Sequence, residues 1–140
     1  MASIPVWKII PFFCSTSIAD TVDFYQNVLK FQVHGKYDHN SLSDATDIKK
    51  ATFASMSIGP QVAANIYFSI QAKPGKAMFA FKTLKALQEY YDMLKAAGPK
   101  VNFSDEIEDQ PWGYRQFNIK DHDQNELIFF AFLGEESEGN

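Results

Sequence analysis

The sequence contains a single cysteine, Cys14, and has no run of Lys or Arg. One thiol excludes an internal disulfide and any zinc site built from several cysteines. With a net charge of −4 and no basic cluster, the chain lacks the surface that binds a phosphate backbone, so we expect no nucleic-acid partner. Neither a GxGxxG nor a Walker-type loop occurs, and we therefore expect no nucleotide cofactor or other cofactor.

Long hydrophobic runs are also missing. The N-terminal stretch MASIPVWKIIPFF is interrupted by prolines and a Lys, so it fits neither a signal peptide nor a membrane span of roughly 20 apolar residues. We expect a cytoplasmic protein with no membrane partner. The 140 residues, 46% hydrophobic and 21% charged, predict one compact domain over 1–140 that ends in an acidic tail at 134–140.

Aromatic side chains are abundant. The chain has 13 Phe, 6 Tyr and 2 Trp, which together make up 15% of its residues. A Phe-rich core accounts for most of them. The others suit a concave site for a neutral or cationic organic ligand, because aromatic rings offer a large and rigid contact area.

The hydrophobic pattern of the first half predicts a helix between strands. Ser17, with Asp20 three residues later, is typical of a helix N-cap, and apolar residues from Ile18 to Leu29 then recur on one helical face. The apolar run at 7–13 predicts a buried strand, and the polar segment at 38–50 predicts a loop. Further strands are predicted at 31–37, 51–58 and 63–70.

The second half repeats this order. Thr83 predicts the cap of a helix that ends at Gly98-Pro99, and the acidic segment SDEIEDQ at 104–110 predicts a loop. Strands are predicted at 76–81, 100–103, 113–119 and 125–132. The chain is therefore expected to be an α+β protein with two β-α-β-β-β modules, at about 5–72 and 75–133.

Three local patterns resemble the vicinal oxygen chelate superfamily, the glyoxalase/bleomycin-resistance/dioxygenase group, over nearly the whole chain. IPFFCSTSIADTVDFYQNVLKF is similar to the opening strand and helix, with Lys30 where Gly is usual. LKALQEYYDMLKAAGPKV is similar to the helix of the second module. PWGYRQFNIKDHDQNELIFF is similar to the closing hairpin, with His122 for Pro and Gln124 for Gly. The resemblance implies two paired modules around a shared cup, and a homodimer that often exchanges elements.

Enzymes of this superfamily usually hold a divalent metal in the cup, and the resemblance places the ligand positions in this sequence. Three of them fall on Ile10, Lys76 and Ile128, and the fourth falls among Asn65, Tyr67 and Ser69. An aliphatic side chain has no lone pair to donate, and Lys is a cation at neutral pH. We therefore expect no metal site. Within the superfamily, the chain most resembles the metal-free members of the bleomycin-resistance type.

Other reactive groups offer weaker signals. Asp121-His122-Asp123 lacks the remaining residues of a calcium loop, so a hairpin turn held by hydrogen bonds to backbone is the better interpretation. The three histidines have no metal-ligand spacing and are expected at the surface. Cys14 lies near a predicted helix N-terminus, a place that can lower the pKa of a thiol. No catalytic signature accompanies it, so a buried or incidental thiol is the favoured interpretation.

Strand alternation assigns one face of the sheet to the cup and the other to the helices. The helix-facing set, which includes Ile9, Phe13, Phe68, Phe81 and Phe129, is nearly all apolar. The cup-facing set mixes aromatic and polar residues: Lys8, Ile10, Phe12, Phe53, Ser55, Asn65, Tyr67, Ser69, Lys76, Met78, Tyr114, Gln116, Asn118, Glu126, Ile128 and Phe130. Such a mixture suits an organic ligand, although a solvent-filled concavity would also tolerate it. Trp112 either stacks on a planar ligand or locks its turn against the core.

The predicted ligand-binding residues are Phe12, Phe53, Tyr67, Met78, Trp112, Tyr114, Gln116, Glu126 and Phe130. The leading hypothesis is a metal-free protein that sequesters an organic molecule such as an antibiotic or natural product. The alternative is a metal-independent isomerase, cyclase or lyase, with Glu126 as general acid or base and Tyr67, Tyr114 or Lys8 as hydrogen-bond donors. A structural salt bridge from Glu126 to Lys8 or Lys76 would explain this carboxylate equally well. A metal-dependent member with unexpected ligands is the weakest possibility.

Overall fold

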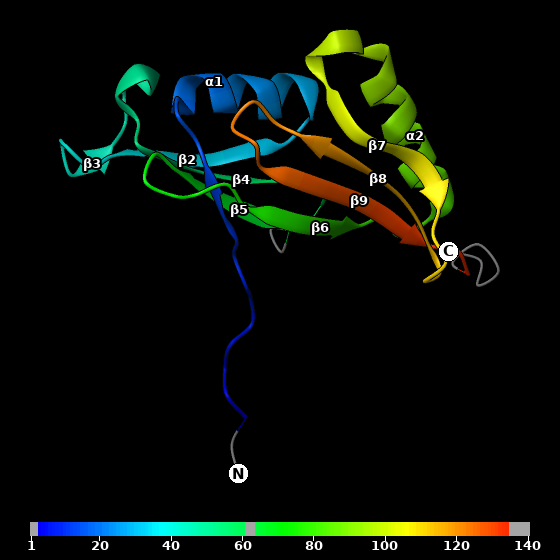
Figure 1. Ribbon diagram of the computed structural model, residues 1–140. Helices are drawn as coiled ribbons and strands as arrows, with labels where there is room; N and C mark the ends of the chain where they lie inside the picture. Colours follow the sequence, from blue (N-terminus) through cyan, green and yellow to red (C-terminus); the bar gives the residue numbers. More distant parts are fainter. Residues whose placement is uncertain (1–2, 61–63, 135–140) are drawn as a thin grey trace.

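A computed structural model of the chain describes residues 3–60 and 64–134. Two mixed sheets are present in these ranges, and each contains the strands of one half of the sequence (Figure 1). The first has the order β1-β5-β4-β2-β3, with β1 at Phe12–Cys14, β5 at Asn65–Ser69, β4 at Phe53–Ser57, β2 at Gln32–Asp38 and β3 at Ser43–Asp44. The second has the order β6-β9-β8-β7, with β6 at Lys76–Ala80, β9 at Glu126–Phe132, β8 at Tyr114–Lys120 and β7 at Asn102–Asp109.

The two sheets share one topology. In each, the first strand pairs in parallel with the last strand, β1 with β5 and β6 with β9, while the other pairs are antiparallel. The predicted α+β class and repeated plan are therefore confirmed. None of the helices within the described ranges combines the length and the apolar character needed to span a membrane.

The helices begin where the sequence predicts. The Ser17 hydroxyl accepts a hydrogen bond from the Asp20 amide, and the Thr83 hydroxyl accepts one from the Ala86 amide at 3.0 Å. These caps satisfy amides that have no partner within the helix. The helices are α1 at Ile18–Asp23, continued by the π-helical turn η1 at Phe24–Val28, and α2 at Leu84–Ala96; short 3-10 turns lie at Ile48–Lys50 (η2) and Gly98–Lys100 (η3).

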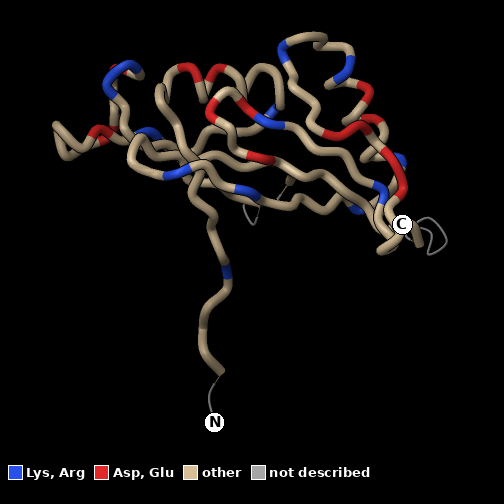
Figure 2. Tube along the Cα trace, in the orientation of Figure 1, with Lys and Arg blue, Asp and Glu red and all other residues tan. Residues whose placement is uncertain are grey.

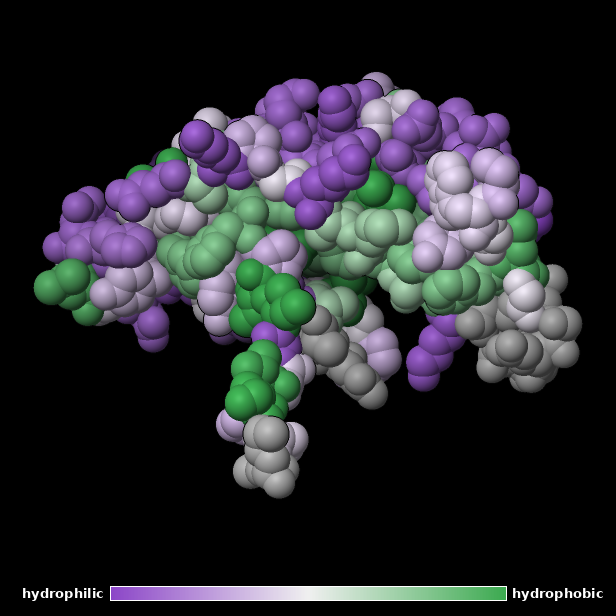
Figure 3. Space-filling model, turned by 60° about the horizontal axis from the view of Figure 1, so that its bottom comes forward, coloured by the Kyte–Doolittle hydropathy of each residue, from purple (hydrophilic) through white to green (hydrophobic). Residues whose placement is uncertain are grey.

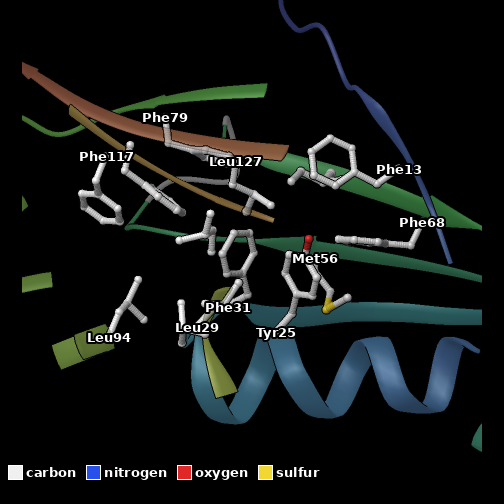
Figure 4. Close-up of a cluster of buried hydrophobic side chains, with 14 of the residues drawn as sticks. Phe13, Tyr25, Leu29, Phe31, Met56, Phe68, Phe79, Leu94, Phe117 and Leu127 are labelled. Atoms are coloured by element: carbon white, nitrogen blue, oxygen red, sulfur yellow. The ribbon is translucent and has the colours of Figure 1, made fainter. Parts of the chain in front are cut away.

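One hydrophobic core lies between the helices and the sheets and includes residues from both halves (Figure 4). Both helices cover the same side of the sheets (Figure 1). The halves meet where the Phe31 and Phe79 rings lie 6.0 Å apart and where the Tyr90 hydroxyl donates to the Leu29 carbonyl at 2.7 Å. Most of the predicted helix-facing set is fully buried: Phe13, Met56, Ile66, Phe68, Phe117, Ile119, Leu127 and Phe129.

The N-terminal segment departs from the prediction of a buried strand at 7–13. Only Phe12 to Cys14 pairs as a strand, and residues 3–11 form an extended arm that leaves the body on the side opposite the helices (Figure 1). Trp7 and Ile9 are 78% and 86% exposed, so the assignment of Ile9 to the core was wrong. The pairing stops at Pro11, which has no N–H to donate and contributes only a carbonyl that accepts from the Tyr67 amide.

The acidic segment predicted as a loop at 104–110 lies in β7, except for its last residue, Gln110. This strand lies at the edge of the second sheet and pairs with β8 on one side only, with two register shifts. Its carboxylates face solvent, and two of them are ion-paired: Glu106 with Lys95 at 2.7 Å and Asp109 with Arg115 at 2.6 Å. Figure 2 shows this concentration of acidic residues along the edge. Charged residues are common on edge strands because they discourage pairing with another chain.

The segment predicted as a loop at 38–50 also contains short elements. Strand β2 extends to Asp38, the two residues of β3 pair with it, and η2 follows. The acidic tail predicted at 134–140 lies outside the described residues except for Gly134.

Candidate functional site

The face of the sheets opposite the helices is open and carries large apolar side chains. Phe12, Met78, Trp112 and Phe132 are each between 43% and 60% exposed. Figure 3 brings this side forward and shows hydrophobic residues across its middle and along the arm. We call this surface the open face. It is the face that strand alternation assigned to a ligand.

An aromatic group on the first sheet occupies one part of the open face. The ring of Tyr67 lies 5.6 Å from that of Phe12 and 4.9 Å from that of Phe53, with edge-to-face geometry in both pairs. Rings in this arrangement attract one another beyond their burial. Beside them is a hollow of about 410 Å³, lined by Gly35, Lys36, Tyr37, His39, Asp44, Phe53 and Ser55.

A second aromatic group lies on the second sheet. The rings of Tyr114 and Phe130 are stacked at 4.5 Å, and the ring of Phe132 meets both edge-on. Phe132 was not among the predicted ligand residues, although it continues the alternation of Glu126, Ile128 and Phe130 along β9. Counting one step further along that strand would have found it.

The polar residues of the open face are hydrogen-bonded or ion-paired. The Lys76 ammonium lies 3.4 Å from the Glu126 carboxylate, and the Lys8 ammonium donates to the Asn65 side chain at 3.3 Å. Trp112 donates its indole N–H to Gln116 at 3.3 Å. Because Trp112 is 60% exposed, it does not lock its turn against the core.

The structure thus divides the predicted ligand residues into two groups rather than one. Phe12, Phe53 and Tyr67 touch one another on the first sheet, and Tyr114 and Phe130 do so on the second. Met78 lies on β6, whose register places it beside Ile128. Among the residues that the structure describes, no ring contact joins the two groups.

A larger hollow, of about 730 Å³, lies away from all the predicted ligand residues. It is at the start of α1 and the end of β2, and its lining is mostly polar: Thr16, Ser17, Ile18, Asp38, Asn40, Ser41, Lys49, Lys50, Ala51, Thr52 and Ile70. Sequence reasoning assigned no site there. The open face remains the better candidate, because aromatic contact area is what an organic ligand uses.

The Asp121-His122-Asp123 segment forms a turn, as predicted. The buried Asp121 carboxylate accepts from the amides of Asp123 and Asn125, both at 2.9 Å, and from the Tyr25 hydroxyl at 2.6 Å. The pKa of the Tyr25 hydroxyl is raised well above its usual value, by burial first and by the neighbouring Asp121 carboxylate second. These hydrogen bonds hold the turn in shape and join it to the core.

The Asn125 side chain ties this turn to the first half of the chain. Its carbonyl accepts from the backbone amides of Cys14 and Gly75, both at 2.9 Å, and its amide donates to the Cys14 carbonyl at 2.7 Å. Gly75 approaches β1 so closely that a Cβ there would lie 2.6 Å from the Phe12 carbonyl oxygen. Backbone from both halves therefore converges on one buried carboxamide.

The suggestion that the pKa of Cys14 is lowered was wrong in direction. Burial raises the pKa of the thiol, and the Asp123 and Asp121 carboxylates raise it further. Desolvation and nearby negative charge both disfavour a thiolate. The three histidines are exposed, as predicted.

The positions that the resemblance assigns to metal ligands do not fit a divalent ion. Ile10 lies in the arm, Ile128 is buried on β9, and the Lys76 ammonium faces Glu126. Aliphatic and ammonium groups donate no lone pair to a cation. Within residues 3–60 and 64–134, no cluster of three or more His, Cys, Asp or Glu side chains is placed to hold a metal.

Residues 12–129 match the family model described as the Glyoxalase/Bleomycin resistance protein/Dioxygenase superfamily. No curated protein matches the chain in sequence. TioX from Micromonospora sp. ML1 has a similar structure, with a TM-score of 0.69 and 15% identity over 91% of this chain and 100% of that one.

Two further solved structures are similar. A glyoxalase-related enzyme from Clostridium phytofermentans has a TM-score of 0.66 and 19% identity over 94% of this chain and 99% of its own. Lactoylglutathione lyase from Agrobacterium tumefaciens has a TM-score of 0.66 and 12% identity over 91% of this chain and 95% of its own. At these identities the likeness shows the shared fold.

Proposed function

Because the chain belongs to the glyoxalase/bleomycin resistance protein/dioxygenase superfamily, we propose that its open face binds an organic molecule without a metal ion and sequesters it. An antibiotic or another natural product with an aromatic body is the kind of ligand that this surface suits. The observation that carries the proposal is the gathering of exposed Phe12, Met78, Trp112 and Phe132 on one uncovered face. Exposed large apolar side chains that gather on one face of a folded protein are typical of a surface that binds a ligand or a partner.

Binding without turnover is favoured over the isomerase, cyclase or lyase alternative. That alternative needs Glu126 as general acid or base, free to exchange a proton with the ligand. The Glu126 carboxylate is instead 3.4 Å from the Lys76 ammonium and is therefore engaged in an ion pair. Tyr67 and Tyr114 remain available to contact the ligand through their rings.

We further propose that two copies associate as a homodimer. Support comes from the arm, where Ile4, Val6, Trp7 and Ile9 are all more than 70% exposed. Four large apolar side chains on one extended segment are unfavourable in water, and a second copy offers them an open apolar face to cover.

The binding proposal can be tested with 8-anilinonaphthalene-1-sulfonate, a probe that fluoresces on apolar surface, and with mass spectrometry of molecules that co-purify with the protein. We expect the probe to bind the native protein and to bind the Trp112→Ser and Phe12→Ser variants at least about fivefold more weakly, because each removes an exposed ring. Met93→Ser is the matched control, since Met93 is an exposed apolar residue of the helix α2. Equal losses in all three variants would contradict a site on the open face.

A turnover assay separates the two functions. A co-purifying molecule that the protein releases unchanged, at a stoichiometry near one per chain, supports sequestration. Conversion of that molecule, abolished by Glu126→Gln while binding is retained, would overturn it in favour of the enzyme.

A further inference from the structure

A chain of hydrogen bonds crosses the open face beside the second aromatic group. The Trp112 indole N–H donates to the Gln116 carbonyl at 3.3 Å, and the Gln116 amide donates to the Asn118 carbonyl at 3.4 Å. The Asn118 amide then donates to the Asp105 carboxylate at 2.8 Å. Gln116 and Asn118 project to the open face because Phe117, between them, is fully buried in the core.

Trp112 and Asp105, at the two ends of this series of hydrogen bonds, fix the orientation of both carboxamides. An indole N–H can only donate, and a carboxylate can only accept. The Gln116 carbonyl therefore points toward Trp112, and the Asn118 amide points toward Asp105. A carboxamide in open solvent flips between two orientations, whereas the Gln116 and Asn118 carboxamides each have a single orientation that fits their hydrogen bonds.

Each carboxamide has an N–H group and a carbonyl lone pair that this series of hydrogen bonds does not use. Gln116 uses one of its two N–H groups and one of the two lone pairs on its carbonyl, and the same holds for Asn118. Asn118 is only 8% exposed, whereas Gln116 is half-buried, so Gln116 is the group that a ligand reaches. Its free N–H and free lone pair lie on one planar group.

Aromatic surface borders Gln116. Phe130, its cross-strand partner in the β8–β9 register, is only 8% exposed, whereas Tyr114, stacked on Phe130 and two residues from Gln116 on the same face, is more accessible. The exposed Trp112 ring is held against Gln116 by its hydrogen bond. A planar ring that lies against the Trp112 and Tyr114 rings brings its own edge to the Gln116 carboxamide.

Building on the proposed binding function, we propose that Gln116 selects planar aromatic ligands that carry a cis amide, an N–H beside a C=O, as in a lactam or an imide. The ligand C=O accepts from the Gln116 N–H, and the ligand N–H donates to the Gln116 carbonyl. Two parallel hydrogen bonds between planar groups select a ligand that has a donor and an acceptor side by side, as the carboxamides of Gln and Asn select adenine. Asp105, through Asn118, is a positioning residue.

The test compares three bicyclic compounds of nearly equal size: 2-quinolinone, which has the cis amide, coumarin, which has oxygen in place of the N–H, and naphthalene, which has neither. We expect 2-quinolinone to bind the native protein about tenfold more tightly than coumarin, because coumarin leaves an acceptor without a partner. Nuclear magnetic resonance with ¹⁵N-labelled protein supplies affinities and shows whether the side-chain NH₂ signals of Gln116 and Asn118 move.

Gln116→Met removes the carboxamide and keeps the length of the side chain. We expect the ratio between 2-quinolinone and coumarin to fall to about one in this variant, while naphthalene binds as before within about twofold. Gln88→Met is the matched control, because Gln88 lies on α2 and hydrogen-bonds to Asp92, away from the open face. Thermal melting of each variant shows whether it is folded, and the NH₂ shifts of the native protein test the contact without any variant.

The outcomes separate this inference from the proposed function. Equal binding of 2-quinolinone and coumarin to the native protein, or a preference that survives in Gln116→Met, would overturn the amide selection and leave binding at the open face standing. Failure of all three compounds to perturb residues of the open face would overturn the amide selection, and the probe-binding test of the proposed function then decides that function separately.

Discussion

Lys30 and Gln124 occupy positions where glycine is usual in the sequence patterns of this family, and both lie in the left-handed region of the backbone. Their φ angles are 66° and 69°. In that region the Cβ of an L-residue crowds the following carbonyl, whereas glycine has no Cβ. The two side chains therefore lower the stability of the turns that they occupy.

Replacing Lys30 with glycine should raise the free energy of unfolding by about 0.5 kcal/mol. The relief of left-handed strain exceeds the extra chain entropy that glycine loses on folding, and the one hydrogen bond lost, from the Lys30 ammonium to the Asn27 carbonyl, is exposed. Urea denaturation measures the change. Lys85→Gly, inside α2, should lose stability instead, and a loss in Lys30→Gly as well would show that the turn is not strained.

The Cys14 thiol should react slowly with iodoacetamide at pH 8. Burial and the two carboxylates Asp123 and Asp121 raise its pKa, so a smaller fraction is present as the reactive thiolate than in an unstructured cysteine. We expect the rate to rise with pH through a midpoint above the ordinary cysteine value. The same protein in urea supplies the control, and a folded-state midpoint at or below the unfolded one would contradict the raised pKa.

At the scale of the elements, the cap of α2 is a local signal that tertiary contacts do not replace. Thr83→Ala should lower the free energy of unfolding by about 1 kcal/mol, because the Ala86 amide loses its 3.0 Å hydrogen bond. Thr83→Ser keeps the hydroxyl and should lose less than half as much. Thr46→Ala, in an exposed loop, is the control in the same urea titration, and equal effects at both sites would argue against the cap.

Elements with local signals could be predicted from the sequence, and elements defined by their neighbours could not. Ser17 and Thr83 begin helices through hydrogen bonds within four residues, so the sequence alone marks them. The acidic β7 becomes a strand because β8 pairs with it, and the local sequence of β7 gives no signal of this pairing. The apolar run at 7–13 fails to become a strand for the opposite reason, since only Phe12 and Phe13 of that run have paired partners on β5.

The candidate site follows the same division. Alternation along the strands placed Phe12, Tyr67, Tyr114 and Phe130 on the open face, because residue parity is a local property. Their separation into two aromatic groups depends on how the sheets lie, and the hydrogen bond from Asn118 to Asp105 depends on a strand that was predicted as a loop.

At the scale of the whole molecule, the arm should control association. We expect sedimentation velocity to show a dimer for the native protein and a monomer for a Trp7→Ser, Ile9→Ser double variant, because these side chains are exposed on the arm and their apolar area stabilises association. Leu42→Ser changes an equally exposed residue of the segment between β2 and β3, and it should leave the dimer intact. A monomeric native protein, or a dimer that tolerates the double variant, would contradict the role of the arm.

The Asn125 carboxamide also makes the two halves of the protein depend on each other. A gene cut after residue 73 would encode two polypeptides, each with a sheet and a helix, but Cys14 would lie on one and Asn125 on the other. Each fragment alone would lack the hydrogen-bond partners that the other supplies, and its share of the common core would face water. The two fragments are therefore expected to fold when they are mixed, by complementation, and to fold poorly when either is alone.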